Sequence, residues 1–138
     1  MSEEITIRYA ESGDKEFWFT FDGHMSADMF DRKVSENQCY LICINSEPVG
    51  ILRYNLFWDN TPFCNLLYIN DGYRRKGLGK ILLDFWENDV KGQGYNSVMT
   101  STQSNEEAQH FYRKSGYRDC GVLLLDNEPS ELFFRKDI

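Results

Sequence analysis

The chain has 138 residues, which suits one domain with a buried core. Its composition, 41% hydrophobic and 27% charged, is ordinary for a globular protein. No apolar run approaches the roughly 18 residues that a membrane span requires, so no membrane partner is expected. The acidic start, Met1–Glu4, lacks the positive flank of a secretion signal, so the cytoplasm is the expected compartment. With no repeat or linker-like tract, residues 1–138 are predicted to form a single domain.

The net charge of −7 is unevenly distributed along the chain. Residues 1–71 carry 12 acidic and 5 basic side chains, whereas residues 72–138 carry 10 of each. An acidic half disfavours nucleic acid as a partner, because phosphate contacts need clustered lysine and arginine. It could attract a small cationic molecule, although a solubilising acidic surface is the plainer explanation.

The first half of the chain is predicted to contain strands, two helices and a hairpin. Met29, Phe30 and Val34 recur at helical spacing after Ser26, which can cap the helix. The turn-forming residues 45–48 separate two strands rich in β-branched and aromatic residues, as in an antiparallel hairpin. The predicted elements of this half are a strand at 5–9, helices at 14–21 and 26–36, and strands at 39–44, 49–58 and 63–69.

The second half begins with an amphipathic helix at 77–90 that two glycines, Gly92 and Gly94, close. Its predicted buried face consists of Leu78, Ile81, Leu82, Phe85, Trp86 and Val90. A strand at 97–101, a helix at 105–115 capped by Asn105 and stopped at Gly116, and strands at 117–125 and 131–135 complete the chain. This order of elements predicts an α/β domain with a mixed sheet.

A metal site has little support in the sequence. None of the four cysteines forms a C-x-x-C pair, and the chain has only two histidines, so no metal is expected. The cysteines are predicted to be buried structural residues. They are Cys39, Cys43, Cys64 and Cys120.

The most informative segment is the glycine-containing turn Arg74–Lys80, which follows the strand at 63–69. Its two glycines open the amphipathic helix, and its four basic residues form the only dense positive charge in an acidic protein. The first turn of a helix has unpaired N–H groups and a partial positive charge, and glycines let a phosphate approach the backbone. The turn is therefore predicted to bind an anion.

Two common phosphate-binding motifs are excluded at this turn. A P-loop needs serine or threonine where Ile81 follows Gly79-Lys80, and glycine where Arg74 stands. The Rossmann fingerprint needs glycine in place of Leu82. The remaining pattern is R-x-x-G-x-G, in which the two glycines are Gly77 and Gly79.

This pattern resembles the pyrophosphate loop Q/R-x-x-G-x-G/A of the GNAT superfamily of acetyltransferases. The preceding L-Y-I-N-D-G-Y at 67–73 is similar to the family's L-x-V-x-P-x-Y/F, with Asp71 in place of a frequent proline. Downstream, N-E-E-A-Q-H-F-Y-R-K-S-G-Y at 105–117 resembles N-x-x-A-x-x-F-Y-x-x-x-G-F/Y. I-R-Y-A at 7–10, followed by Asp14, resembles the family's opening, and Arg75 replaces a frequent glycine. The resemblance spans nearly the whole chain.

The resemblance implies a GNAT-like fold: one α/β domain with a mixed, mostly antiparallel sheet, splayed between the fourth and fifth strands and flanked by helices. It implies acetyl-CoA as co-substrate, with the pantetheine arm paired to Leu67–Ile69 and the pyrophosphate on backbone amides of the loop. The residues implied to contact the cofactor are Leu67, Tyr68, Ile69, Arg74, Arg75, Lys76, Gly77, Leu78, Gly79, Lys80, Asn105, Phe111 and Tyr112.

The same resemblance implies acetyl transfer to a primary amine by direct attack in a ternary complex. The backbone N–H of Leu67 would stabilise the oxyanion, and Tyr112 would protonate the departing thiolate. Spacing alone favours a different role for Tyr112, that of a core aromatic residue. A non-catalytic acyl-CoA-binding domain and a pure interaction module are the alternative functions, and the chain could be a monomer or a homodimer.

The general base is not identified by the sequence. Phe63 stands where the histone-acetylating branch of the family has a glutamate, and Asp59, Glu131 or a water chain could substitute. Five aromatic residues could form a box for a cationic amine or simply fill the core. They are Trp18, Phe19, Phe21, Phe57 and Trp58.

Overall fold

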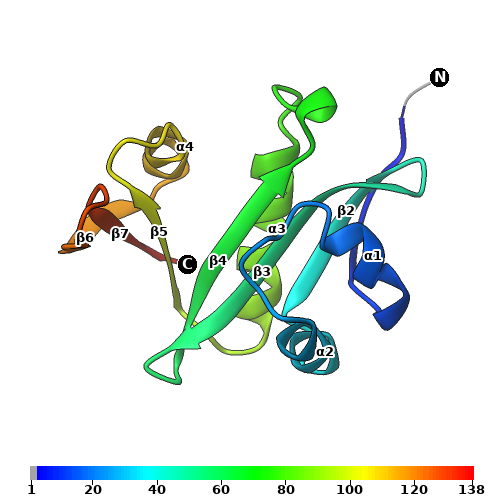
Figure 1. Cartoon of the computed structure of the whole chain (residues 1–138), viewed down its shortest axis with the longest axis horizontal. Coiled ribbons are helices and arrows are strands. Elements are labelled where there is room, and N and C mark those ends of the chain that lie inside the picture. The colour runs from blue at the N-terminus through cyan, green and yellow to red at the C-terminus, as the bar shows by residue number, and fades with distance from the viewer. Residues whose placement is uncertain (1–2) are drawn as a thin grey trace. The chain divides into compact units, whose positions relative to one another are not determined.

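The computed structural model describes residues 3–138. Strands and helices follow one another in the predicted order, with short 3-10 turns at Ser12–Asp14 and Asp71–Tyr73. The elements are β1 (Ile5–Tyr9), α1 (Lys15–Trp18), α2 (Ala27–Ser35), β2 (Cys39–Ile44), β3 (Glu47–Phe57), β4 (Thr61–Ile69), α3 (Leu78–Gly92), β5 (Ser97–Gln103), α4 (Ala108–Lys114), β6 (Arg118–Leu123) and β7 (Glu131–Asp137) (Figure 1).

The strands form a seven-stranded sheet in the order β1-β2-β3-β4-β5-β7-β6. Neighbours β1–β2, β2–β3, β5–β7 and β6–β7 are antiparallel, whereas β4 and β5 are parallel. The predicted mixed sheet is therefore confirmed. The register between β4 and β5 joins only Phe63 to Met99 and Cys64 to Thr100, a short ladder that agrees with the predicted splay of these two strands.

The chain divides into two compact units. The first unit contains the residues up to Tyr54 together with Leu66–Phe85. The second unit contains Asn55–Asn65 together with Trp86–Ile138. Both β4 and α3 contribute residues to the two units.

The core of the first unit is built on β2, every residue of which is buried. Figure 1 shows α1 and α2 on one side of β2 and β3, where Trp18 and Phe30 meet with ring centroids 5.5 Å apart. On its other side β2 presents Tyr40 to Phe85 of α3, at 6.0 Å. Apolar residues on both faces explain why β2 reads as a continuous hydrophobic run rather than an alternating one.

A buried ion pair holds the segment after α1 against β3. The Asp22 carboxylate accepts hydrogen bonds from Arg53 Nε at 2.7 Å and from Trp18 Nε1 at 2.9 Å. Burial alone would raise the pKa of Asp22, but the hydrogen bonds from Arg53 and Trp18 outweigh it and lower the pKa below its usual value.

The second unit has its helices on the side of β7 that carries Phe134 and Lys136. Phe134 is fully buried and stacks on Tyr112 of α4 at a centroid distance of 6.4 Å. Glu87 of α3 accepts hydrogen bonds from the Tyr117 hydroxyl at 2.8 Å and from Lys136 Nζ at 2.7 Å. Burial and the neighbouring carboxylate raise the pKa of Tyr117, so this phenol stays protonated.

Most local helix signals in the sequence are confirmed. Ser26 caps α2 by accepting a hydrogen bond from Met29 N at 3.1 Å, and Gly116 ends α4 with φ of 96°. The first helix is shorter than predicted, because residues 12–14 form a 3-10 turn and α1 ends at Trp18. The helix at 105–115 begins later than predicted: Ala108 is its first residue and Glu107 its N-cap position, so Asn105 does not cap it.

Three further expectations about burial are wrong. Ile81 and Phe85, placed on the buried face of α3, are 40% and 41% exposed, while Leu83 is fully buried instead. The face of α3 was assigned from helical period alone, and the period cannot show where neighbouring elements stop covering the helix. Cys120 is exposed on the edge strand β6, unlike the other three cysteines.

Candidate functional site

The predicted anion-binding loop lies entirely within the first unit and leaves β4 through the 3-10 turn Asp71–Tyr73. Asp71, the residue that replaces a frequent proline, opens this turn and pairs with Arg74 at 2.9 Å. Arg74 Nε also donates to the Ile69 carbonyl at 2.8 Å, and the guanidinium lies 4.9 Å from the Tyr68 ring centroid. The Arg74 side chain therefore fixes the exit of β4, a role that the motif does not reveal.

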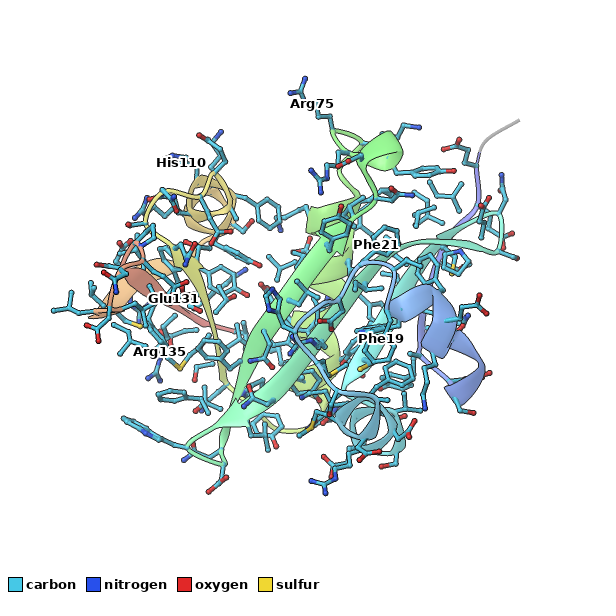
Figure 2. All side chains as sticks on the ribbon, viewed as in Figure 1. Phe19, Phe21, Arg75, His110, Glu131 and Arg135 are labelled. Atoms are coloured by element: carbon cyan, nitrogen blue, oxygen red, sulfur yellow. The ribbon has the colours of Figure 1, made fainter. Side chains whose placement is uncertain are left out.

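The glycine turn itself uses a left-handed backbone. Arg75 has φ of 64° and Gly77 has φ of 78°, a region that glycine adopts readily and other residues adopt with strain. Figure 2 shows the Arg75 side chain projecting away from the loop. This left-handed conformation explains why glycine would suit position 75, where this chain has arginine. Because the Arg75 side chain points away from the loop, the backbone of Arg75 is the part of the residue that shapes the turn.

Helix α3 starts at Leu78, directly after the turn. Ile81 N donates to the Gly77 carbonyl at 3.1 Å, so the regular helical hydrogen bonds begin there. The amides of Leu78, Gly79 and Lys80 precede that first bond, and the first amides of a helix have no intrahelical acceptor. The loop thus presents a row of backbone donors at the start of α3, the kind of group that an anion needs. Lys80 forms an ion pair with Asp84 one turn further along the helix.

The three strand residues expected to pair with the cofactor arm, Leu67, Tyr68 and Ile69, are all partly exposed. Tyr68 packs against the core of the first unit, where its ring stacks on Phe21 at a centroid distance of 5.0 Å. Strand alternation places Leu67 and Ile69 on the opposite face from Tyr68. Gly50 of β3 allows a close approach here, because a Cβ atom would lie 3.0 Å from the Tyr68 carbonyl oxygen.

Tyr112, the predicted general acid, lies in the second unit and is only 5% exposed. Burial raises the pKa of Tyr112 well above its usual value, together with the nearby Cys64, while hydrogen bonding to the Thr100 side chain acts in the opposite direction. The phenol is therefore protonated at neutral pH. A protonated phenol can donate a proton and cannot act as a base.

The surroundings of Tyr112 coincide with the last registered pair between β4 and β5. Cys64 and Thr100 form that pair, and Thr100 Oγ1 donates to the Cys64 carbonyl at 3.0 Å. The Tyr112 hydroxyl interacts with both residues. A core aromatic residue would need only its ring contacts, whereas this hydroxyl is directed to the point where the two parallel strands cease to pair.

The other two predicted cofactor residues of the second unit differ in placement. Phe111 neighbours Tyr112 on α4, with ring centroids 5.2 Å apart, and is half-buried. Asn105 is exposed and lies before the helix. The structure therefore brings Phe111 and Tyr112 together and leaves Asn105 at the entrance to α4.

The five candidate aromatic residues belong to different units. Trp18, Phe19 and Phe21 belong to the core of the first unit, where Figure 2 labels the latter two. Phe57 and Trp58 belong to the second unit and pack on each other at 4.8 Å. The core-filling interpretation is therefore supported for Trp18, Phe19 and Phe21.

Asp59 and Glu131, the two candidate carboxylates, also differ. Asp59 is exposed in the turn between β3 and β4, with φ of 63°. Glu131, at the start of β7, is half-buried and accepts a hydrogen bond from Ser101 Oγ at 2.7 Å. Of the two, only Glu131 is held in a fixed position by a neighbouring strand.

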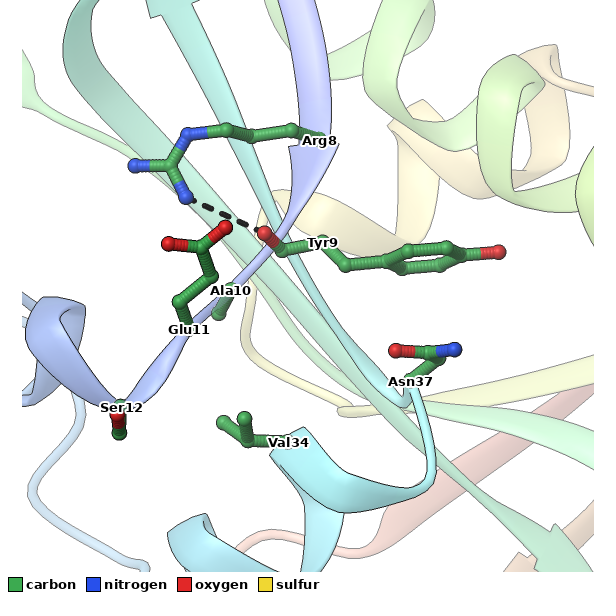
Figure 3. Close-up of a pocket in the computed structure, with 7 residues that line it drawn as sticks. All are labelled: Arg8, Tyr9, Ala10, Glu11, Ser12, Val34 and Asn37. Atoms are coloured by element: carbon green, nitrogen blue, oxygen red, sulfur yellow. Dashed lines mark hydrogen bonds between the residues drawn. The ribbon is translucent and has the colours of Figure 1, made fainter.

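A surface cavity of about 510 Å³ lies elsewhere in the first unit (Figure 3). Residues from the end of β1, the segment after it and the end of α2 line this cavity, and none of them belongs to the predicted site. Its only basic side chain, Arg8, is already engaged by Asp14 through hydrogen bonds of 2.8 and 2.9 Å. We assign this cavity no role in the chemistry.

Within residues 3–138, no three or more histidine, cysteine, aspartate or glutamate side chains are grouped so that they could hold a metal ion. None of the described helices combines the length and the apolar character needed to cross a bilayer.

The fold defined by this sheet and loop is that of the GNAT acetyltransferases. Ard1 from Thermoplasma volcanium superposes with a TM-score of 0.83 at 18% identity, covering 97% of both chains. A GNAT family acetyltransferase from Elizabethkingia anophelis, whose structure has acetyl-CoA bound, gives a TM-score of 0.77 at 17% identity and covers 97% of this chain and 98% of its own.

Sequence comparison shows the family to which the chain belongs. The profile of the Acetyltransferase (GNAT) family matches residues 5–117. A Bacillus subtilis (strain 168) protein that carries the name "Putative acetyltransferase" is 32% identical over 111 residues, which cover 80% of this chain and 74% of that protein. The chain belongs to the GNAT acetyltransferase family.

Proposed function

We propose that this protein is an acetyl-CoA-dependent N-acetyltransferase that acts on a primary amine in a ternary complex. The observation that carries the proposal is the protonated Tyr112 phenol beside Cys64 and Thr100, the last registered pair of β4 and β5. A buried proton donor at that point has a use in thioester chemistry, where a thiolate leaves. A non-catalytic acyl-CoA-binding domain would have no use for that donor.

The first unit supplies the groups for cofactor binding. We assign the pyrophosphate to the backbone amides of Arg75, Gly77, Gly79 and Lys80, where the start of α3 adds a partial positive charge. The pantetheine arm pairs with the backbone of Leu67–Ile69. The Leu67 N–H is assigned to the oxyanion, since a fixed amide needs no reorganisation when negative charge develops.

The reaction requires one bond to form and one to break. The neutral amine nitrogen attacks the thioester carbonyl carbon, and a C–N bond forms as the carbonyl oxygen becomes an oxyanion. The C–S bond then breaks, and the thiolate takes the proton of the Tyr112 hydroxyl. The amine nitrogen loses its extra proton to water, and the phenolate recovers a proton from solvent.

The acceptor is proposed to be a small cationic molecule. This rests on the 12 acidic and 5 basic residues of positions 1–71, which include the region where the family places its acceptor-binding helices. A negative surface raises the local concentration of a cationic substrate and weakens as salt screens it. The cytoplasm is the proposed compartment.

A thiol-release assay tests the activity. The protein is mixed with acetyl-CoA and a panel of polyamines, aminoglycosides, amino acids and peptide N-termini, and free CoA thiol is measured. Release with at least one amine supports the enzyme, whereas binding of acetyl-CoA without any thiol release supports the non-catalytic alternative.

Binding at the loop has its own test. Acetyl-CoA should raise the melting temperature by mass action, and Gly79→Asp should abolish the rise by placing an anion against the pyrophosphate. An aspartate in the first turn of a helix is electrostatically favourable, so the variant should still fold. Gly13→Asp is the matched control, because Gly13 has open space around it and lies outside the loop. A parent protein that does not respond to millimolar acetyl-CoA contradicts the proposal.

A further inference from the structure

A continuous row of aromatic rings crosses the second unit. Trp58 packs on Phe57 at a centroid distance of 4.8 Å, and Phe57 stacks on Phe63 at 5.9 Å. Phe63 in turn contacts Phe133 of β7 at 5.8 Å. By the resemblance, Phe63 stands where the histone-acetylating branch of the family has a glutamate, so the row has apolar surface where that branch has a charged group.

This row, Trp58–Phe57–Phe63–Phe133, lies on the side of the sheet away from the helices of its unit. Successive residues of a strand point to opposite faces, so Phe133 points away from Phe134. Phe134 is the residue that stacks on α4, and Lys136, on the same face as Phe134, reaches Glu87 of α3. Phe133 and its neighbours therefore form a separate surface of the unit.

One carboxylate stands at the end of this surface. Glu131 precedes Phe133 by two residues on β7 and shares its face. Its Oε2 accepts the hydrogen bond from Ser101 Oγ at 2.7 Å, which holds the carboxylate in place. Within the described part of the chain, Glu131 forms no ion pair with any lysine, arginine or histidine. A half-buried carboxylate that no basic side chain neutralises can pair with a cation of a ligand.

We propose that Glu131 and the ring of Phe133 bind a cationic group of the acceptor. The inference rests on the proposed function and identifies residues that select the amine. A carboxylate attracts an ammonium group directly, and the faces of aromatic rings attract it through their quadrupole. Phe63 is buried and packs against Phe133, so it supports that ring from within the unit. Phe133 is half-buried, so a cation that lies on its ring loses part of its water and both attractions strengthen.

Arg135 places a positive charge at the opposite end of this surface from Glu131. It lies on the same face as Glu131 and Phe133, two residues beyond Phe133 (Figure 2). Four residues along a strand separate Glu131 from Arg135 by about 13 Å. The positive guanidinium repels a second cation, so the cationic group of the acceptor is confined to the Glu131 end of the row.

The test is the kinetics of Glu131→Gln with the amine that gives the highest kcat/KM in the thiol-release panel. Glutamine keeps an acceptor for Ser101 and removes only the charge. We expect the KM for the amine to rise about 10-fold to 100-fold, the range for a lost charge-assisted hydrogen bond. The KM for acetyl-CoA should change by less than about 3-fold, because Glu131 contributes none of the groups assigned to the cofactor.

Glu128→Gln is the matched control, since Glu128 is an exposed carboxylate in the turn before β7. It should leave both KM values unchanged. Phe133→Leu, which keeps an apolar side chain but removes the ring, should raise the amine KM by about 3-fold to 10-fold. Salt should raise the amine KM of the parent protein and have a smaller effect on Glu131→Gln.

The results separate this inference from the function on which it rests. An active parent enzyme whose amine KM is unaffected by Glu131→Gln overturns the cation site and leaves the acetyltransferase proposal standing. An equal rise in both KM values also overturns it, because that pattern reports a general disturbance of the fold. A parent protein that releases no thiol with any amine overturns both proposals.

Discussion

Replacing Tyr112 by phenylalanine removes one hydroxyl group and keeps every ring contact. The phenyl ring would still stack on Phe134 at 6.4 Å and meet Tyr117 edge-on at 5.5 Å. Thr100 Oγ1 would keep its bond to the Cys64 carbonyl, so no buried group loses its only partner. The free energy of unfolding should therefore fall by only about 0.5–1.5 kcal/mol, the net value of a typical hydrogen bond.

The effect on catalysis should be much larger. Proton donation to the departing thiolate matters in the transition state and not in the ground state, so the loss belongs in kcat. A general acid typically contributes at least about 10²-fold, which corresponds to about 2.7 kcal/mol of the barrier. Because burial raises the pKa of Tyr112, the parent enzyme should show no loss of kcat from phenol ionisation below about pH 10.

The assay compares Tyr112→Phe with Tyr117→Phe in thiol release, thermal melting and acetyl-CoA affinity. Tyr117 is an equally buried tyrosine of the same unit, and its hydroxyl donates to Glu87, which keeps Lys136 as a partner when that hydroxyl is removed. Both variants should lose similar stability, and only Tyr112→Phe should lose kcat. Equal kcat values for the two variants would refute the reasoning and return Tyr112 to the role of a core aromatic residue.

Two further predictions concern the first unit. Arg75 has φ of 64°, so Arg75→Gly should match or exceed the stability of the parent, while the β-branched Arg75→Val should lose about 1–2 kcal/mol in urea unfolding; a less stable glycine variant would contradict this. The pKa of Asp22 is lowered in the folded state, so its contribution is complete above the unfolded pKa of about 4 and is lost as pH falls through the lower folded value. Asp22→Asn should cost about 3 kcal/mol at neutral pH and flatten the acid dependence of the melting temperature, whereas parallel acid profiles would show that Asp22 contributes nothing to it.

Local patterns in the sequence were sufficient for most of the secondary structure. Ser26, Gly94 and Gly116 begin or end helices through caps that depend on a few neighbouring residues, and these caps are predicted correctly. The glycine turn at the start of α3 was also found from local spacing. The predicted N-cap at Asn105 is wrong. Asparagine is a capping residue type, but the helix begins three residues later, at Ala108.

The contacts that define the site could not be predicted, because they join residues far apart in the sequence. Nothing near Asp22 indicates that Arg53 will neutralise it, and nothing near Glu131 indicates that Ser101 will hold it. Nothing in the spacing of the aromatic residues indicates that Trp18 packs on Phe30 or that Phe57 stacks on Phe63. The Phe63–Phe133 contact likewise needs β4, β5 and β7 side by side.

The arrangement of charge around the loop favours backbone amides over side chains as the proposed anion ligands. Two of its four basic residues are already neutralised within the first unit, Arg74 by Asp71 and Lys80 by Asp84. A third, Arg75, projects away from the loop (Figure 2). Lys76 Nζ lies 5.6 Å from the centroid of the Tyr73 ring. Exposed ion pairs contribute little and are screened by salt, whereas amides fixed by the turn keep their positions and their dipoles. The basic side chains of the loop therefore stabilise its shape. The unpaired backbone N–H groups of the loop are the part suited to bind a phosphate.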